Sequence, residues 1–239
     1  MKKILISALV TVGLFAFGLQ GYSQVSFGVK TGLNVNNISQ DFANSDMEYD
    51  TKMKAGFHFG PAVNIGFTDQ LGLQTGLIFT SKGFSMDLDE WSNDDFDVDG
   101  YFRFRFNYLE IPLSVAFNIE GFQVYAGPYV AIGIGGTAVE KYEVKFEGTT
   151  FYEEDDSFNL KPVFGDYDPA DLDEDEDAFN ALDFGLNFGL GYKVGPVLLN
   201  AGYSLGLGNM TPGIKDSDFD PDDRKMSNRV ITVSASFYF

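Results

Sequence analysis

The sequence predicts an all-β fold, specifically an eight-stranded antiparallel up-and-down transmembrane β-barrel. Three observations lead to this prediction. Apolar and polar residues alternate with a period of two after residue 24, the connections between the alternating segments are short and long in turn, and the acidic residues gather in the long connections. A period of two places alternate side chains on opposite faces of a strand. The predicted strands are residues 25–35, 56–67, 71–82, 108–118, 122–134, 182–193, 197–208 and 228–239.

Residues 1–23 have the pattern of a signal peptide. Lys2 and Lys3 precede an apolar stretch that ends near Leu19, and the small residues Gly21 and Ser23 stand three and one places before the predicted cleavage point. The alternative, a retained membrane helix, fits less well because the apolar stretch is short. The barrel domain is therefore predicted to cover residues 24–239, and insertion of this domain in a membrane would depend on its strands.

Each of the first four segments has one apolar face, and its other face is small or polar. The apolar faces are Val25, Phe27, Val29, Leu33 and Val35; Phe57, Phe59, Val63, Ile65 and Phe67; Leu71, Leu73, Leu77 and Phe79; and Leu109, Ile111, Leu113, Val115 and Phe117. Lys82 lies on the polar face of the third segment. Upstream of the fourth segment the alternation is reversed, because the face that is polar within the segment carries Phe102, Phe104 and Phe106. This reversal predicts a bulge near residue 107 or a change of surroundings above it.

The last four segments continue the pattern. Their apolar faces are Phe122, Val124, Ala126, Val130, Ile132 and Ile134; Leu182, Phe184, Leu186, Phe188, Leu190 and Tyr192; Val197, Leu199, Ala201, Tyr203, Leu205 and Leu207; and Ile231, Val233, Ala235, Phe237 and Phe239. Pro61, Pro112 and Pro128 each remove a hydrogen-bond donor from a strand, so we expect them at bulges or strand margins.

The residue sizes indicate which face points inward. The polar faces are rich in Gly, Ser and Asn, which suit the narrow interior of a small barrel, whereas a face in contact with water would carry more Lys and Glu. Aromatic residues of the apolar face near the short turns are typical of a lipid-facing wall at the headgroup level. A secreted barrel with an apolar core has the same period and is the alternative.

The connections indicate the orientation. Residues 68–70, 119–121 and 195–196 form short turns, whereas 37–54, 85–100, 137–180 and 209–226 are long and hold 31 of the 35 acidic residues. Bacterial outer-membrane barrels have short periplasmic turns and long external loops. We therefore predict an outer-membrane location with periplasmic termini and acidic external loops.

Composition excludes several classes of function. With 35 acidic against 16 basic residues and a net charge of -19, the chain is unsuited to nucleic acid. It has no cysteine and a single histidine, His58, so thiol chemistry, a zinc site with two histidines and a histidine-dependent triad with a spare base are excluded. A lipid hydrolase would need a histidine on the lipid side, but His58 has the parity of the interior. We expect no enzyme and no resident cofactor.

Charged and phenolic residues with interior parity predict a polar network that fills the lumen. Its members are Lys30, Glu110, Asp183, Lys193, Tyr125 and Tyr129. A charge inside a barrel needs an opposite partner, and Lys30 is predicted to pair with Glu110 because both lie at similar depths. Eight strands enclose a space just wide enough for side chains, so an open channel is not expected.

The acidic connections offer carboxylates for a cation. Asp95, Asp97 and Asp99 followed by Gly100 resemble the first half of a calcium-binding loop, but Phe106 stands where that loop needs a bidentate glutamate. The prediction is weak Ca²⁺ or Mg²⁺ binding, which could link the loops to the phosphates of lipopolysaccharide; solvated acidic loops are the alternative. Trp91 marks either a contact with a surface protein or glycan or the packing of the loop base.

Four stretches resemble the PorT-like family of porin-type outer-membrane β-barrel proteins. They are residues 27–34 (FGVKTGLN), 108–113 (YLEIPL), 184–192 (FGLNFGLGY) and the terminal 237–239 (FYF). The resemblance covers essentially the mature chain and brings no catalytic residue. It implies an outer-membrane protein, in some members linked to protein secretion. The terminal Phe239 resembles the signal that the barrel assembly machinery reads.

These observations predict a monomeric, non-enzymatic integral outer-membrane protein with a structural or surface-interaction role. Its partners would be outer-membrane lipid, lipopolysaccharide and a surface protein or glycan. The alternative is a porin-like transporter of small or hydrophobic solutes, which would need an open lumen or a side opening beneath the loops.

Overall fold

The computed structural model describes residues 24–42, 50–88, 92, 96–146, 149–215, 217 and 220–239. The predicted signal peptide, Trp91 and Asp95 lie outside the described residues. Among the described residues, no helix is long and apolar enough to cross a membrane.

The described residues form one sheet of twelve strands with two short 3₁₀ helices. The strands are β1 (Gln24–Phe42), β2 (Thr51–Lys52), β3 (Lys54–Gly66), β4 (Leu71–Gly76), β5 (Ile78–Asp87), β6 (Phe96–Ile119), β7 (Phe122–Phe146), β8 (Thr149–Val163), β9 (Glu176–Asn180), β10 (Leu182–Val194), β11 (Val197–Gly206) and β12 (Arg224–Tyr238). The 3₁₀ helices are η2 (Pro169–Asp171) and η3 (Pro221–Asp223).

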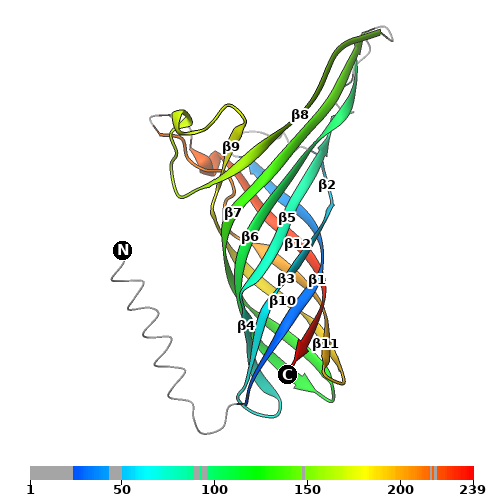
Figure 1. Cartoon of the computed structure of the whole chain (residues 1–239), viewed down its shortest axis with the longest axis vertical. Coiled ribbons are helices and arrows are strands. Elements are labelled where there is room, and N and C mark those ends of the chain that lie inside the picture. The colour runs from blue at the N-terminus through cyan, green and yellow to red at the C-terminus, as the bar shows by residue number, and fades with distance from the viewer. Residues whose placement is uncertain are drawn as a thin grey trace.

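The sheet closes on itself as a barrel (Figure 1). β1 pairs with β3 on one side and β12 on the other, and the pairing continues through β11, β10, β7 and β6 to β4 and β5, which return to β3. All these pairs are antiparallel. The strand count differs from the predicted eight because β4 and β5 follow one another along β6, and because β2, β8 and β9 add to the sheet beyond this ring.

The interruption between β4 and β5 coincides with prolines. Leu77 separates the two strands, and its N–H donates to the carbonyl of Pro61 on β3 at 3.1 Å. On β6, Pro112 lies opposite Tyr129, and the β6–β7 ladder resumes only at Val115. The prolines therefore stand where pairing is broken, as their missing N–H groups require.

The outward face of the barrel is apolar, as predicted. Leu33 is 70% exposed, and six alternate residues of β6 lie exposed on the outside: Leu109, Ile111, Leu113, Val115, Phe117 and Ile119. Between them, Tyr108 and Glu110 are buried in the interior. A soluble protein rarely exposes an apolar surface of this extent, whereas lipid accommodates it. The predicted aromatic residues near the short turns, such as Phe122 and Tyr192, also lie on the outside.

The run of phenylalanines on β6 marks a change of surroundings. Phe106 and Phe104 keep the inward parity of Tyr108, while Arg105 and Arg103 point outward. A register shift also occurs between Asn107 and Tyr108, opposite Ile134 of β7. Above residue 107 the interior thus becomes apolar and the exterior polar, which accounts for the reversed pattern.

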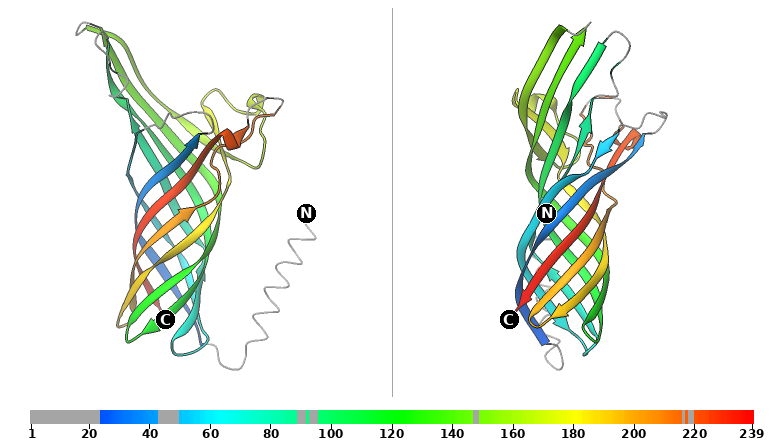
Figure 2. Two further views of the ribbon diagram at one scale, coloured as in Figure 1. Left: turned by 180° about the vertical axis from the view of Figure 1, so that it is seen from behind. Right: turned by 90° about the vertical axis from the view of Figure 1, so that its right-hand side faces the viewer.

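The long connections were predicted as loops, and this prediction is wrong for much of them. The β6–β7 ladder continues as far as Phe96 opposite Phe146, and β8 joins it from Gly136 opposite Leu160 to Phe146 opposite Thr149. These strands form an arm that projects beyond the barrel (Figure 2). Pairing satisfies the backbone N–H and C=O groups of the arm, whatever the charge of its side chains.

Candidate functional site

A buried cluster of charges crosses the middle of the lumen. Lys82 of β5 lies between two carboxylates, with its Nζ 3.0 Å from Oε2 of Glu110 on β6 and 2.9 Å from Oδ2 of Asp183 on β10. The side chains of Lys82 and Asp183 are each 2% exposed. β5 and β6 are neighbouring strands, whereas β10 lies beyond β7, so the Lys82–Asp183 ion pair crosses the lumen and the Lys82–Glu110 pair joins adjacent strands.

Neighbouring polar and aromatic groups complete the cluster. Asn228 Nδ2 donates to Asp183 at 3.0 Å, and the Tyr129 hydroxyl lies 3.3 Å from both oxygens of the same carboxylate. Asn187 Nδ2 donates to Glu110 at 3.2 Å. The Lys82 ammonium also lies 4.4 Å from the ring centroid of Tyr129. Each buried charge therefore has several compensating contacts, as a low-dielectric interior requires.

Three residues of the predicted network, Glu110, Asp183 and Tyr129, meet in this cluster. The residue that joins them, Lys82, was missing from the predicted network. Its interior parity on the third segment was visible in the sequence, and that signal alone could have added it to the candidates.

The predicted ion pair between Lys30 and Glu110 is absent from the described part of the chain, where Glu110 is bound by Lys82 and Asn187. Lys82 of β5, the strand that pairs directly with β6, lies opposite Phe106, and its long side chain reaches back along the lumen to Glu110. Lys30 lines the same cavity as both residues. Together with Lys82 it balances the charges of Glu110 and Asp183.

Lys193 does not belong to the lumen network. Its side chain is exposed beside the turn that joins β10 to β11, and its N–H donates to the carbonyl of Gly121 at 2.8 Å. A lysine so close to the barrel end reaches water instead of the interior. Tyr125, in contrast, faces the lumen as predicted, where it packs against Gly189 and Gly202.

A cavity lies on the short-turn side of the charge cluster. It offers about 60 Å³ to water-sized molecules, and its lining includes Lys30, His58, Gln74, Tyr125 and Ser236. The lining is polar and holds unpaired acceptors such as His58 Nε2. These properties suit ordered water, which pairs with polar groups that the protein leaves unsatisfied.

His58 belongs to the barrel interior, as its parity predicts. Asn34 donates its amide to Thr80 Oγ1 and to the carbonyls of Phe57 and Ser81, so its Oδ1 accepts from His58 Nδ1 at 2.7 Å. This arrangement leaves Nε2 as the acceptor that faces the cavity. The residue is buried away from the lipid side, where a lipid hydrolase would need it.

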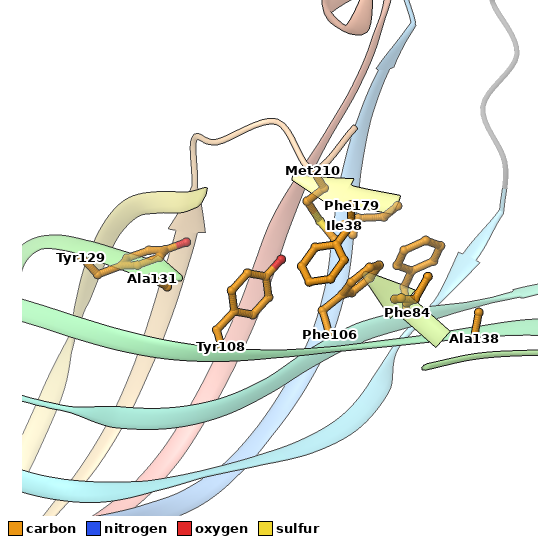
Figure 3. Packing of buried hydrophobic residues seen from close by; sticks show 10 residues of the cluster. Ile38, Phe84, Phe106, Tyr108, Tyr129, Ala131, Ala138, Phe179 and Met210 are labelled. Atoms are coloured by element: carbon orange, nitrogen blue, oxygen red, sulfur yellow. The ribbon is translucent and has the colours of Figure 1, made fainter. Parts of the chain in front are cut away.

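A cluster of aromatic and other apolar side chains packs together inside the barrel, on the arm side of the charge cluster (Figure 3). Phe179 of β9 lies 5.0 Å from Phe106 and 5.9 Å from Tyr108 between ring centroids. Phe84 of β5 and Met210 pack in the same cluster. Along β5, Phe84 follows Lys82 by two residues, so the apolar layer rests directly on the charged one.

Two of the three residues predicted to bind a cation, Asp97 and Asp99, lie in a regular strand. Asp97 and Asp99 belong to β6 and pair with Lys145 and Glu143 of β7, so the calcium-loop conformation expected for residues 95–100 is not formed by the described part of that segment. Among the described residues, no group of three or more His, Cys, Asp or Glu could hold a metal ion. Weak binding of Ca²⁺ or Mg²⁺ stays a prediction.

The arm brings like charges together. Glu143 lies opposite Glu153, and Glu140 lies opposite Asp156. Partial burial, with Glu154 and Asp156 nearby, raises the pKa of Glu140. Ion pairs such as Lys141–Asp155 relieve part of this repulsion.

One family of known proteins matches the chain, and several solved structures are similar to it. A family model described as an outer membrane protein beta-barrel domain matches residues 19–211. The chain is similar to Ail, the attachment invasion locus protein of Yersinia pestis, solved in complex with the heparin analogue sucrose octasulfate, with 14% identity, 90% of this chain and 99% of that chain covered, and a TM-score of 0.37.

Two further solved structures are similar at the same level. Neisserial surface protein A has 13% identity, with 90% of this chain and 99% of that chain covered and a TM-score of 0.35. OprG from Pseudomonas aeruginosa has 12% identity, with 92% of this chain and 98% of that chain covered and a TM-score of 0.35. No curated protein matches the chain.

Proposed function

Because the chain belongs to the outer membrane protein beta-barrel domain family, we propose that it is a non-enzymatic outer-membrane protein with a closed lumen and a surface-interaction role. The family and the outward apolar face locate it in the outer membrane. The observation that supports a closed lumen best is Lys82, held between Glu110 and Asp183 beneath an aromatic layer. A solute would have to break both layers to pass.

We infer that the barrel wall in the membrane has eight strand positions around its circumference. Seven are occupied by β1, β3, β6, β7, β10, β11 and β12, and the eighth is shared by β4 and β5. The ring of pairings supports this count. The short turns and the two ends of the barrel domain share one end of the barrel (Figure 1), so both termini are periplasmic. The protein acts as a monomer, and Phe239 on the outer surface serves as the signal for the barrel assembly machinery.

The projecting arm is the proposed contact surface for a surface protein or glycan. Its acidic side chains, including Glu153 and Asp155, are exposed and favour basic partners or weakly bound divalent cations. Membership of the PorT-like group, with its link to secretion, remains a prediction from the four resembling stretches.

A flux experiment tests the closed lumen. Liposomes that contain the purified protein are expected to release small solutes no faster than protein-free liposomes, because the charge cluster and the aromatic layer block the lumen. Release of a fluorescent dye and swelling in sugar solutions measure this flux. Solute flux above the protein-free background would instead support a porin-like transporter.

The cavity is the specific observation that favours this alternative. Its space on the short-turn side, about 60 Å³ for water-sized molecules, holds a few waters, so a small solute could enter from the periplasm only if the lining side chains moved. Transport would then require Lys82 to leave its two carboxylates. Flux that depends on the charge state of Glu110 and Asp183 would identify this route.

The orientation can be tested with single cysteines, because the chain has none. Thr149→Cys at the end of the arm is expected to react with a membrane-impermeant maleimide on intact cells. Asp69→Cys in a short turn, equally exposed, should react only after the outer membrane is permeabilised. The opposite pattern would show that the short turns face outward.

A further inference from the structure

The outward face of β6 changes from apolar to basic at a defined height. The apolar residues from Ile119 to Leu109 span ten residue steps, about 33 Å along a strand. With a tilt of roughly 40°, this run is about 25 Å tall, the height of the lipid-facing band of an outer-membrane barrel. The next outward positions are Asn107, Arg105 and Arg103. The two arginines therefore lie just beyond the apolar band on the arm side.

The two arginines have no acidic partner among the residues that the structure describes. Neither forms an ion pair with any described residue, although Arg103 lies over the Tyr101 ring with 3.8 Å to its centroid. Their direct neighbours across the strands are uncharged. These are Gly83 and Ser85 on β5 and Thr137 and Val139 on β7, followed by Asn159 and Ser157 on β8.

A third cation, Lys54 of β3, approaches the same section of β6 from the interior face of the sheet, because it shares the parity of buried His58. Lys54 Nζ donates to the carbonyl of Phe104, the residue between the two arginines, at 3.2 Å. The two arginines thus place two positive charges on the outward face of one short section of β6, in a chain with a net charge of -19. Exposed Thr137, Ser157 and Asn159 add hydrogen-bond donors to the same outward surface. We name Arg103, Arg105, Thr137, Ser157 and Asn159 the rim patch.

We propose that the rim patch binds phosphate groups of lipopolysaccharide in the outer leaflet. Guanidinium groups bind phosphate oxygens by charge-assisted, bidentate hydrogen bonds, and their long side chains reach back to the headgroup level. The inference deepens the proposed function, because it relies on the arm side facing outward. Asp97 and Asp99, farther along the same strand, repel phosphates and confine them to the patch.

Binding of purified lipopolysaccharide to the full-length mature protein in detergent tests this proposal. The double variant Arg103→Gln/Arg105→Gln is expected to bind at least about tenfold more weakly than the wild type, because two charge-assisted contacts are lost. The matched control Lys141→Gln/Lys161→Gln removes the same charge from lysines that already pair with Asp155 and Glu176. The control is expected to stay within about twofold of the wild type.

Three results would overturn the proposal: wild-type affinity in the arginine variant, equal affinity of the wild type for dephosphorylated lipopolysaccharide, or equally tight binding of phosphatidylglycerol micelles. Gel mobility with and without heating verifies that each variant is folded before it is tested. The binding assay is carried out in detergent, so it measures neither solute flux nor the orientation of the protein in the membrane. A failure of the rim patch is therefore distinguishable from a failure of the proposed function.

Discussion

Replacement of Lys82 by alanine is expected to lower the free energy of unfolding by about 3–5 kcal/mol, because it leaves Glu110 and Asp183 buried without their cation. The Lys82 ammonium contacts both carboxylates within 3.0 Å, and its side chain is almost fully buried. Alanine also removes the ammonium from the ring of Tyr129. Urea unfolding of the protein in lipid vesicles, followed by the fluorescence of its single tryptophan, measures the loss.

Two comparisons separate this effect from a general loss of a lysine. Lys193→Ala removes an exposed lysine and should change stability by less than about 0.5 kcal/mol. The variant Lys30→Met/Lys82→Met/Glu110→Gln/Asp183→Asn removes the two acids and both lysines that balance them, and it should regain most of the stability that Lys82→Ala loses. Equal stability of the wild type and Lys82→Ala would contradict the structural role of the cluster.

The faces of the strands were predictable because the burial of a β-strand side chain follows its parity. Leu109 and Ile111 face outward and Glu110 faces inward, as the alternation indicates. The small residues of the polar face indicated that this face points into the barrel, since bulky polar side chains would not fit its narrow interior. Sequence reasoning therefore correctly predicted the barrel wall, its short turns and its lipid-facing surface.

The partners inside the lumen were not predictable from parity alone. Lys30 and Lys82 both point inward, but the stagger of the strands decides which of them reaches Glu110. That stagger depends on irregularities such as the break at Leu77 and the shift at Asn107, which no local pattern locates. Parity also placed Lys193 in the lumen, although its distance from the barrel end exposes it.

The arm was misread for another reason. Its acidic composition is typical of solvated loops, and the prediction followed composition. Pairing of Tyr142 with Glu154, and of neighbouring residues, joins β7 to β8 in spite of their charge. β9 was missed because its five residues, Glu176–Asn180, are too few for a clear period, and its parallel contact with β8 arises from the fold.

Replacement of Phe179 by alanine should open the lumen on the arm side. The Phe179 side chain is 2% exposed, and it packs against Phe106 and Tyr108 from a strand that is itself short. Loss of a buried phenylalanine is expected to lower the free energy of unfolding by about 3–5 kcal/mol. Urea unfolding measures this loss, and faster proteolysis between residues 164 and 178 would report the release of β9.

Phe164 supplies a matched control from the same segment. Its side chain is 69% exposed, so Phe164→Ala should change stability by less than about 0.5 kcal/mol and leave the proteolysis rate unaltered. Similar losses in both variants would show that the segment responds to any lost phenylalanine, and that Phe179 does not seal the lumen.

Gly133 of β7 provides a test of the contact itself. A Cβ added at Gly133 would lie 2.7 Å from the Phe179 ring, too close for the ring to keep its place. Gly133→Ala should therefore lower the free energy of unfolding of the wild type. The loss should be much smaller in the Phe179→Ala background, where the ring is absent. A coupling of about 0.5–3 kcal/mol in this double-mutant cycle is the range for residues in contact. Additive costs would mean that the ring of Phe179 does not rest on Gly133, and the aromatic seal would lose its support.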